Sequence, residues 1–267
     1  MKIPVLTARA DDFSMKYVRF GGGPRTMVIL PGLAIGHVTD SAEAVARSYE
    51  AMTGEFTVYL FDRREDPPSG YTVEAMAEDT AKAMLSIGLS GVYLFGASQG
   101  GMMAMTIAAR HPGLVKKLAL GSTAAKTSDG RAAAVKEWTE IARRGDGEEL
   151  YLEFGRKLYT DEVFERYRDA LAFMGRQVAA RDLDRFVIFA GAADGFDITG
   201  ELADIDCPVL LLSDSDDRVL GPDAAAEIES ALGSRPDFES FTYSGFGHAA
   251  YDTAPDYRER LLAFFIK

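Results

Sequence analysis

VYLFGASQGG, residues 92–101, is the stretch of sequence that decides the fold of this chain. It passes from an apolar run of strand type into a segment of helical period, and Gly96, Ser98 and Gly100 form the pattern GxSxG at the junction. A sharp turn from strand to helix holds its central residue in a strained backbone conformation, with the side chain above the sheet. Its neighbours must be almost without side chains, or they would collide across the turn. Ser98 is therefore the predicted nucleophile.

Apolar runs alternate along the chain with segments of helical period. Nearly unbroken runs, typical of strands buried on both faces of a parallel sheet, occur at residues 26–30, 57–61, 92–95, 118–120 and 209–212. Two further strands are predicted, at an edge of the sheet and near the chain end, over 15–20 and 238–243. Helices are predicted over 40–52, 73–87, 99–110, 222–232 and 256–266. This alternation predicts a doubly wound α/β sheet with right-handed crossovers.

The alternation breaks between residues 123 and 206, where no strand is evident. The helical period in this part predicts helices over 132–144, 148–158, 161–174 and 182–190. We therefore expect a helical insertion between two strands of the sheet. The resulting organisation is a core domain of residues 1–122 and 207–267, with an inserted domain of residues 123–206.

Composition limits the class of protein. The 267 residues include 29 Lys and Arg against 41 Asp and Glu, a net charge of −12, and 47% are hydrophobic. This balance is that of a globular chain, and so acidic a chain repels nucleic acid and anionic membranes. The single Cys207 is interpreted as a buried core residue. With no apolar leader and no apolar run of about 18 residues, we expect a cytoplasmic protein. The oligomeric state is not predicted.

A serine hydroxyl needs a neighbouring base to act as a nucleophile at neutral pH. The chain has three histidines. His248 lies in a glycine-flanked loop after the last expected strand and is the predicted base. His111 precedes Pro112 at the end of a helix and is interpreted as a helix cap. His37 follows the first strand–loop region and is a weaker alternative.

The base in turn needs a carboxylate that fixes its tautomer. The segment after residues 209–212 offers three acids, Asp214, Asp216 and Asp217. Asp217 is favoured, because it stands just before the point where the loop is expected to turn back toward the carboxyl edge of the sheet. Asp214 and Asp216 stay open as alternatives, and otherwise they form turns or pair with Arg218.

Acyl transfer also needs donors for the oxyanion that develops on the carbonyl oxygen. One expected donor is the backbone N–H of Gln99, which follows the nucleophile. The other is the backbone N–H of Leu33, in the loop Pro31-Gly32-Leu33 after residues 26–30. Gly32 lets the backbone turn close to the site.

The chain order Ser98, Asp217, His248, together with the GxSxG turn, the Pro31-Gly32 loop and the helical insertion, resembles the α/β-hydrolase superfamily over nearly the whole chain. The resemblance implies an eight-stranded, mostly parallel sheet, and makes the insertion a cap that selects the substrate. Asp62-Arg63-Arg64 looks like the Asp-x-Arg turn of that family, although the usual glycines after it are replaced by Glu65-Asp66-Pro67-Pro68. The Gly-Gly-Gly motif of some lipases is absent, and Gly21 to Gly23 are interpreted as a hairpin turn.

The resemblance implies a serine hydrolase of small, fairly apolar esters or related acyl compounds, acting without a metal or cofactor. Serine at residue 98 disfavours dehalogenases and epoxide hydrolases, which use aspartate there. Gln99 stands where prolyl aminopeptidases usually carry tryptophan. Hydrolysis of carbon–carbon bonds, acyl transfer to an acceptor other than water, and a non-catalytic ligand receptor stay open as alternatives.

Large apolar side chains in the insertion are expected mainly to pack it on the core domain, and in part to line an acyl pocket. They are Trp138, Tyr151, Phe154, Tyr159, Phe164, Phe173, Met174, Phe186 and Phe196.

Overall fold

One eight-stranded sheet runs through the computed structural model, which describes residues 2–128 and 130–267. Its order is β1-β2-β4-β3-β5-β6-β7-β8; β1 and β4 pair with β2 in antiparallel fashion, and all other neighbours are parallel. The strands are β1 (Val5–Ala10), β2 (Phe13–Gly21), β3 (Arg25–Leu30), β4 (Phe56–Arg64), β5 (Val92–Ala97), β6 (Val115–Gly121), β7 (Val209–Asp214) and β8 (Phe238–Tyr243). The chain thus has the expected mostly parallel α/β sheet.

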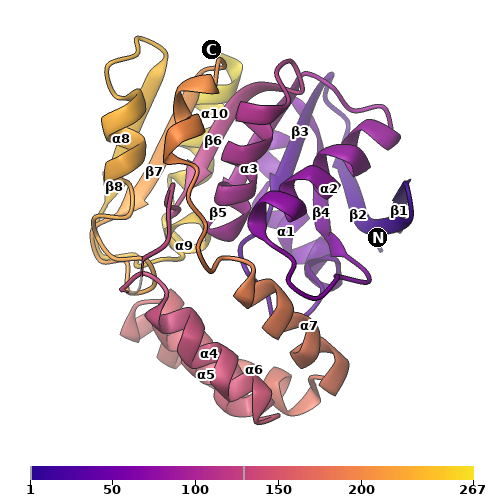
Figure 1. Cartoon of the computed structure of the whole chain (residues 1–267), viewed down its shortest axis with the longest axis vertical. Coiled ribbons are helices and arrows are strands. Elements are labelled where there is room, and N and C mark those ends of the chain that lie inside the picture. Colours follow the sequence, from indigo (N-terminus) through magenta and orange to yellow (C-terminus); the bar gives the residue numbers. More distant parts are fainter. Residues whose placement is uncertain (1, 129) are drawn as a thin grey trace.

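Helices cover both faces of the sheet (Figure 1). Buried side chains of α2, α3 and α8 pack with the strands in one apolar cluster, and those of α1 and α10 pack in a second cluster. The helices are α1 (Ala42–Ser48), α2 (Val73–Ser86), α3 (Gln99–Arg110), α4 (Ala133–Arg143), α5 (Gly147–Leu158), α6 (Asp161–Gln177), α7 (Ala180–Gly191), α8 (Ala226–Leu232), α9 (Ala250–Thr253) and α10 (Tyr257–Ile266). Covering of both faces explains the nearly unbroken apolar runs of the central strands.

Several local expectations are wrong. Gly21 to Gly23 do not form a hairpin turn, because β2 pairs with β4 and not with β3. Residues 62–64 are not a turn, since pairing with β2 extends β4 to Arg64. The helix expected over 40–52 is broken into 3₁₀ turns on either side of α1, and the one expected from residue 222 begins only at Ala226. Strand β1 was not expected as an element.

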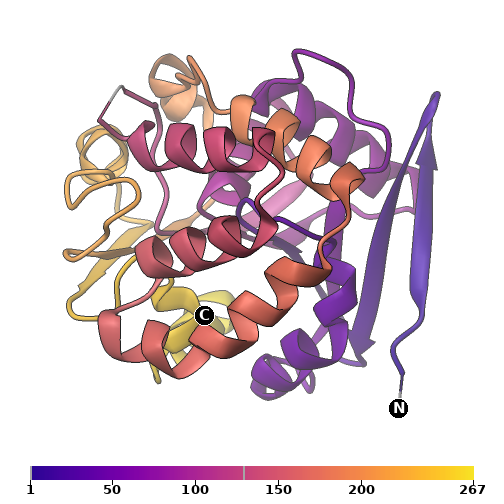
Figure 2. The same ribbon diagram turned by 90° about the horizontal axis from the view of Figure 1, so that it is seen from below.

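Helices α4–α7 lie together beyond the carboxyl ends of the parallel strands, as Figures 1 and 2 show from two directions. We call them the helical layer. All of them fall within residues 123–206, the expected inserted domain, and they follow β6 and precede β7. Residues 1 and 129, which the expected domain ranges include, lie outside the described residues.

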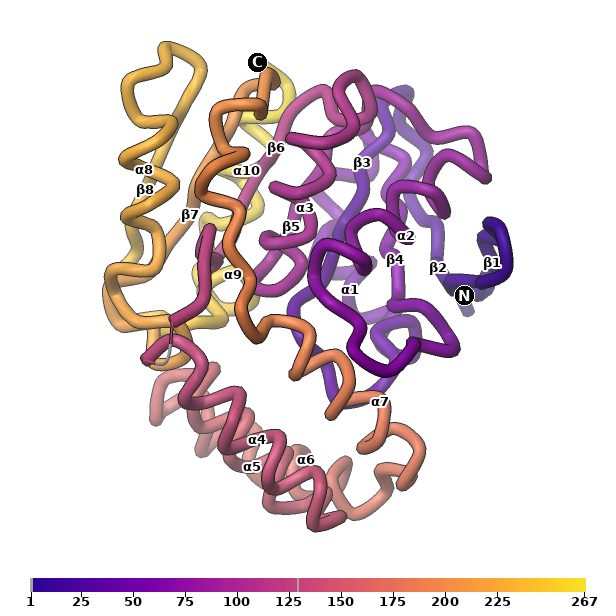
Figure 3. The backbone as a smooth tube through the Cα atoms, viewed as in Figure 1, coloured from indigo at the N-terminus to yellow at the C-terminus, as the bar shows by residue number. Residues whose placement is uncertain are grey.

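The chain enters and leaves the helical layer through two segments, residues 122–128 with 130–132, and residues 192–208, which lie side by side (Figure 3). We call them the crossing segments. Lys126 and Asp197 form an antiparallel bridge, and Thr127 N donates a hydrogen bond of 2.9 Å to Phe196 O. Ile198 N donates to Ala125 O at 2.9 Å. The two segments therefore behave as one short ribbon that joins the helical layer to the sheet.

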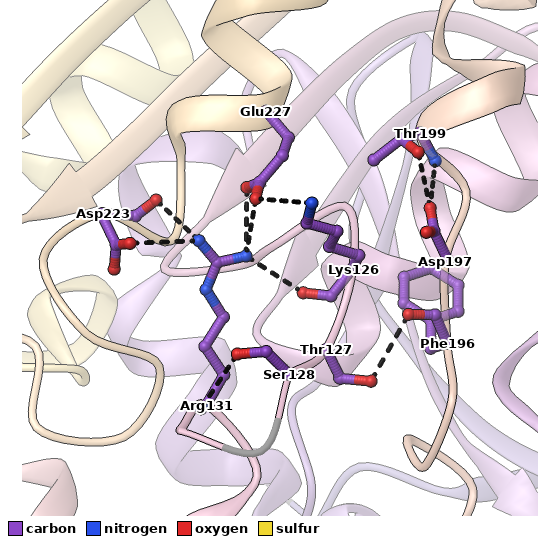
Figure 4. Close-up of polar contacts among 9 residues, drawn as sticks. All are labelled: Lys126, Thr127, Ser128, Arg131, Phe196, Asp197, Thr199, Asp223 and Glu227. Carbon is purple, nitrogen blue, oxygen red and sulfur yellow. Dashed lines mark hydrogen bonds and ion pairs between the residues drawn. The ribbon is translucent and has the colours of Figure 1, made fainter.

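A buried arginine attaches this ribbon to the sheet domain (Figure 4). Arg131 Nη1 donates to both carboxylate oxygens of Glu227 at 3.1 and 3.0 Å, and also to Lys126 O at 3.2 Å. Arg131 Nη2 donates to Asp223 O at 3.0 Å. Burial alone would raise the pKa of Glu227, but the hydrogen bond from Arg131 and the nearby cations lower it. The carboxylate of Glu227 therefore stabilises the folded chain as an anion.

We predict that Glu227→Gln destabilises the protein by about 1 kcal/mol at pH 7, a typical contribution for a partly exposed ion pair. The pKa of Glu227 is lower in the folded chain. Its contribution is therefore present above the unfolded pKa of about 4.3 and is lost as pH falls through the folded pKa. The difference between native protein and variant, measured by urea unfolding, should shrink between pH 6 and pH 3. Glu229→Gln, an exposed position of the same helix, should show no such difference. A constant difference for Glu227→Gln would contradict the pairing.

Candidate functional site

Ser98 lies on a strained turn between β5 and α3. Its backbone has φ 51° and ψ −122°, and a positive φ is costly for a residue with a side chain. Neighbouring groups hold this conformation: Ser98 N donates to Gly121 O at 2.8 Å, and Ser98 O accepts from Gly101 N and Thr123 Oγ1, both at 2.8 Å. The side chain is partly exposed, and it faces a cavity.

Glycines make this turn sterically possible. A Cβ atom on Gly96 would overlap the carbonyl oxygen of Gly100, and one on Gly100 would overlap the carbonyl oxygens of Leu30 and Pro31. A Cβ atom on Gly32 would lie 3.2 Å from Ser98 Cβ. The turn after β5 and the loop after β3 are therefore in direct contact.

His248 and Asp217 form a buried pair. His248 Nδ1 lies 2.8 Å from Asp217 Oδ2, and the residues are 1% and 6% exposed. Burial would raise the pKa of Asp217, but the charge of His248 and hydrogen bonds from His248, Leu220 and Val219 lower it. Asp217 Oδ1 accepts those two backbone hydrogen bonds at 2.9 and 2.7 Å. The carboxylate can therefore remain ionised beside the imidazole.

The other two acids of this segment hold the loop that carries His248. Asp214 Oδ2 accepts a hydrogen bond from Phe246 N at 3.1 Å, and Asp214 Oδ1 accepts one from Asp216 N at 2.8 Å. Asp216 Oδ2 accepts from Gly245 N at 2.7 Å. Arg218 pairs with Asp161 of α6 at 2.6 Å. Of the three acids, Asp217 is the one that the structure places against His248.

Ser98 and His248 line the same cavity, with Gly32, Leu33 and Gln99. Within the described residues no hydrogen bond joins Ser98 Oγ to the imidazole; such bonds commonly tighten only when substrate binds. Gln99 begins α3, so its backbone N–H is one of the N–H groups that a helix leaves without an internal partner. Such groups carry a partial positive charge and favour an anion.

The cavity lies between the sheet and the helical layer and has a volume of about 210 Å³. Its wall is mainly apolar and also includes charged side chains of α4 and of the segment after α7. The larger apolar members are Leu33, Met102, Val135, Trp138, Phe154, Leu158, Val219, Leu220 and Tyr251. The cavity suits a small, largely apolar molecule that presents one polar group to Ser98.

Of the large apolar residues of the insertion, expected mainly to pack and in part to line a pocket, two line the cavity. The lining includes Trp138 and Phe154, whose rings lie 4.5 Å apart, whereas Phe173 and Met174 are exposed on α6. Sequence reasoning missed Tyr251 on the short helix α9, which follows the His248 loop. The place of Tyr251 in the sequence, directly after that loop, was the signal that could have identified it as a cavity residue.

The other histidines lie outside this cavity wall. His37 Nδ1 is 3.0 Å from Asp62 Oδ2, and Arg185 Nη1 is 3.1 Å from His37 Nε2. His111 follows α3 as its cap, and its Nε2 is 3.0 Å from Glu78 Oε2. Within residues 2–128 and 130–267, no group of three or more His, Cys, Asp or Glu is arranged to hold a metal ion.

Residues 25–149 match a family model described as the alpha/beta hydrolase fold. The RutD protein of Pantoea ananatis, named as a carbamate hydrolase, is 26% identical over 220 residues, which are 77% of this chain and 76% of that relative. The protein of the same name from Agrobacterium fabrum is 24% identical over 234 residues, covering 81% of this chain and 85% of the relative.

Solved structures show the same arrangement. The alpha/beta hydrolase MGS-M2 from a Medee basin deep-sea metagenome library has a TM-score of 0.86 at 20% identity, covering 98% of both chains. The enol-lactonase of Burkholderia xenovorans LB400 has a TM-score of 0.83 at 21% identity, covering 98% of this chain and all of that one. At these identities the likeness is one of fold.

We predict that Gly100→Ala destabilises the protein by at least about 2 kcal/mol, because the new methyl group would overlap two backbone carbonyl groups that cannot move aside. Urea unfolding monitored by circular dichroism measures the effect. Gly22→Ala is the matched control, since a Cβ atom there meets nothing within 4 Å. Equal stability of the two variants would contradict the close approach.

Proposed function

We propose that this chain, whose fold is that of the α/β-hydrolases, is a serine hydrolase of small, mainly apolar esters or related acyl compounds. Hydrolase is also the activity in the names of its relatives. The carbamate and the enol-lactone in the names of two similar proteins are both acyl compounds with an electrophilic carbonyl group.

One observation carries the proposal: a buried imidazole, oriented by a carboxylate at 2.8 Å, shares a cavity with a serine at a strained strand–helix turn. Each group alone has ordinary structural explanations. Together they are what nucleophilic acyl transfer requires, namely a nucleophile, a base and a group that fixes the tautomer of the base.

In the proposed mechanism, Ser98 Oγ attacks the carbonyl carbon while His248 Nε2 accepts the hydroxyl proton. Asp217 keeps the proton on His248 Nδ1 and stabilises the imidazolium. The backbone N–H groups of Leu33 and Gln99 donate to the oxyanion. His248 then protonates the leaving group, and a water molecule, deprotonated by the same imidazole, releases the acyl group from Ser98.

The cavity supports the substrate class. About 210 Å³ is small for a ligand pocket, and the apolar wall favours a hydrocarbon acyl or alcohol part. In the described residues no helix is long and apolar enough to cross a bilayer. The acidic composition disfavours nucleic acid and anionic membranes as partners, and we propose a small-molecule substrate and the cytoplasm as the place of action.

Two alternatives use the same residues differently. Hydrolysis of a carbon–carbon bond or transfer of the acyl group to an acceptor other than water would need the same nucleophile and base. A panel of an ester, a thioester, a lactone, a carbamate and a β-diketone, assayed with native protein and Ser98→Ala, separates these reactions. A ligand receptor of the same fold would bind without turnover.

We predict that Ser98→Ala lowers kcat/KM for p-nitrophenyl butyrate by at least about 10³-fold, because the nucleophile is removed. A fluorophosphonate probe should label the native protein stoichiometrically and leave Ser98→Ala unlabelled. Ser213→Ala is the control, since Ser213 Oγ lies on β7 and is engaged with Thr242 Oγ1 at 3.0 Å. Native-rate labelling of Ser98→Ala would refute the assignment, and an unlabelled native protein would favour the receptor.

We predict that Asp217→Asn lowers kcat by about 10³ to 10⁴-fold, because an amide stabilises the wrong tautomer of His248. Asp216→Asn should lower kcat by less than about tenfold, since its amide oxygen can still accept the hydrogen bond from Gly245 N. Steady-state kinetics of the two variants measures the difference. A larger loss in Asp216→Asn would overturn the choice among the three acids.

A further inference from the structure

Arg63 is a buried cation whose position is not explained by the sheet in which it lies. It stands near the end of β4 and is 7% exposed. Among the described residues, no carboxylate forms an ion pair with its guanidinium. Instead, Arg63 Nη2 donates a hydrogen bond to Pro31 O at 2.6 Å and, more weakly, to Gly32 O at 3.4 Å. Both acceptors belong to the loop that carries Leu33.

From this contact we infer that Arg63 is a positioning residue for the oxyanion site: it holds the carbonyl groups of Pro31 and Gly32 on one side of the loop, so that the N–H of Leu33 points to the other. The inference rests on the proposed function, because Leu33 matters only if an oxyanion forms at Ser98.

The planarity of the peptide bond links the two sides of the loop. In a trans peptide the C=O of one residue and the N–H of the next point in opposite directions. A hydrogen bond that draws the carbonyl of Gly32 toward Arg63 therefore turns the N–H of Leu33 away from Arg63. The Cα of Gly32 packs beside Ser98, where an added Cβ would lie 3.8 Å from Ser98 Oγ. By this inference, the N–H of Leu33 is directed toward the side of the loop on which Ser98 lies.

The neighbouring residue holds the far end of the same loop. Asp62 Oδ2 accepts a hydrogen bond from Thr39 Oγ1 at 3.2 Å and lies 3.0 Å from His37 Nδ1, while Asp62 Oδ1 accepts from Arg63 N at 2.7 Å. Two consecutive residues of β4 therefore hold residues 31–39 at both ends. A loop held in this way keeps its N–H groups oriented before substrate arrives, as electrostatic stabilisation of a transition state requires.

The cost of burying this arginine also argues for function. Arg63 Nε and Nη1 are buried, and they have no hydrogen-bond partner among the described residues. Burial lowers the pKa of Arg63 to about 10, so the side chain is still a cation at neutral pH. A well-packed apolar side chain would often serve stability as well as such a charge. The cation also polarises the amide groups to which it donates, which strengthens their N–H groups as donors.

The test uses Arg63→Met, with Arg64→Met as the matched control. Arg64 is the next residue of β4, but it pairs with Asp79 at 3.0 Å and stacks over Phe13 instead of contacting the loop. With p-nitrophenyl butyrate, Arg63→Met should lower kcat by about 10- to 100-fold, less than the loss of an entire oxyanion donor, with KM changed by less than about threefold. Arg63→Lys should recover part of kcat, since an ammonium group can still donate to Pro31 O.

Inhibitor binding separates an effect on the oxyanion from a general structural effect. An alkyl trifluoromethyl ketone accepts Ser98 Oγ at its carbonyl carbon, the serine proton passes to His248, and the carbonyl oxygen becomes an oxyanion. Its inhibition constant should rise about 10- to 100-fold in Arg63→Met, whereas that of 1-butanol, a neutral molecule that forms no oxyanion, should be unchanged. Parallel weakening of both inhibitors, or native values for both, would overturn the inference.

Two further measurements complete the design. Circular dichroism and size-exclusion chromatography establish whether Arg63→Met is folded; if it is not, Arg63→Gln takes its place, and a native ratio of the two inhibition constants overturns the inference. Fluorophosphonate labelling of the native protein tests the proposed function separately. If native Ser98 is labelled and the Arg63 variant has native inhibition constants, only the role of Arg63 is rejected. If the native protein is not labelled, the serine hydrolase is rejected and this role with it.

Discussion

Where Gly100 packs against the carbonyl groups of Leu30 and Pro31, the turn after β5 and the loop after β3 come into backbone contact. This contact is possible only without a side chain at residue 100, and it fixes Ser98 at a positive φ. The two expected oxyanion donors, Leu33 and Gln99, lie on the two sides of the contact. The geometry of the proposed reaction therefore depends on how closely two backbones approach, more than on any single side chain.

In the acidic segment after β7, three nearby carboxylates of one short loop have different structural roles. Asp214 and Asp216 accept hydrogen bonds from the backbone of the His248 loop, and Asp217 meets the imidazole. The three carboxylates are close in sequence, yet each has a different set of partners. Backbone N–H groups and His248 lower the pKa values of Asp216 and Asp217 and so stabilise these two anions, whereas burial raises the pKa of Asp214.

Much of the fold follows from the sequence because its signals are local. The predicted strand over 238–243 and the predicted helix over 99–110, the latter from a helical period after GxSxG, have the bounds of β8 and α3. Strand β1 lacks such a signal, since Val5 and Leu6 are exposed. The pairing of β2 with β4 could not be predicted, because it joins residues distant in the chain and is decided by the packing of the whole sheet.

The residues of the site also fall into two groups, those with a local sequence signal and those whose role depends on distant contacts. Ser98, His248 and Asp217 each stand in a local pattern that indicates their chemistry. The contribution of Arg63 could not be predicted, because β4 was expected to end before it and its partners, Pro31 and Gly32, lie on another strand's loop. The residues that form the wall of the cavity could not be predicted either, since they depend on how α4–α7 pack over the sheet.

The ribbon formed by the crossing segments has one more implication. Because residues 126 and 197 are bridged, the distance between the two points where the chain leaves and rejoins the sheet domain does not depend on what lies between them. Helices α4–α7 could therefore differ in length without moving β6 or β7, between which they are inserted. The helical layer is thus joined to the sheet domain through one short ribbon, which makes it a natural unit for grafting between proteins of this architecture.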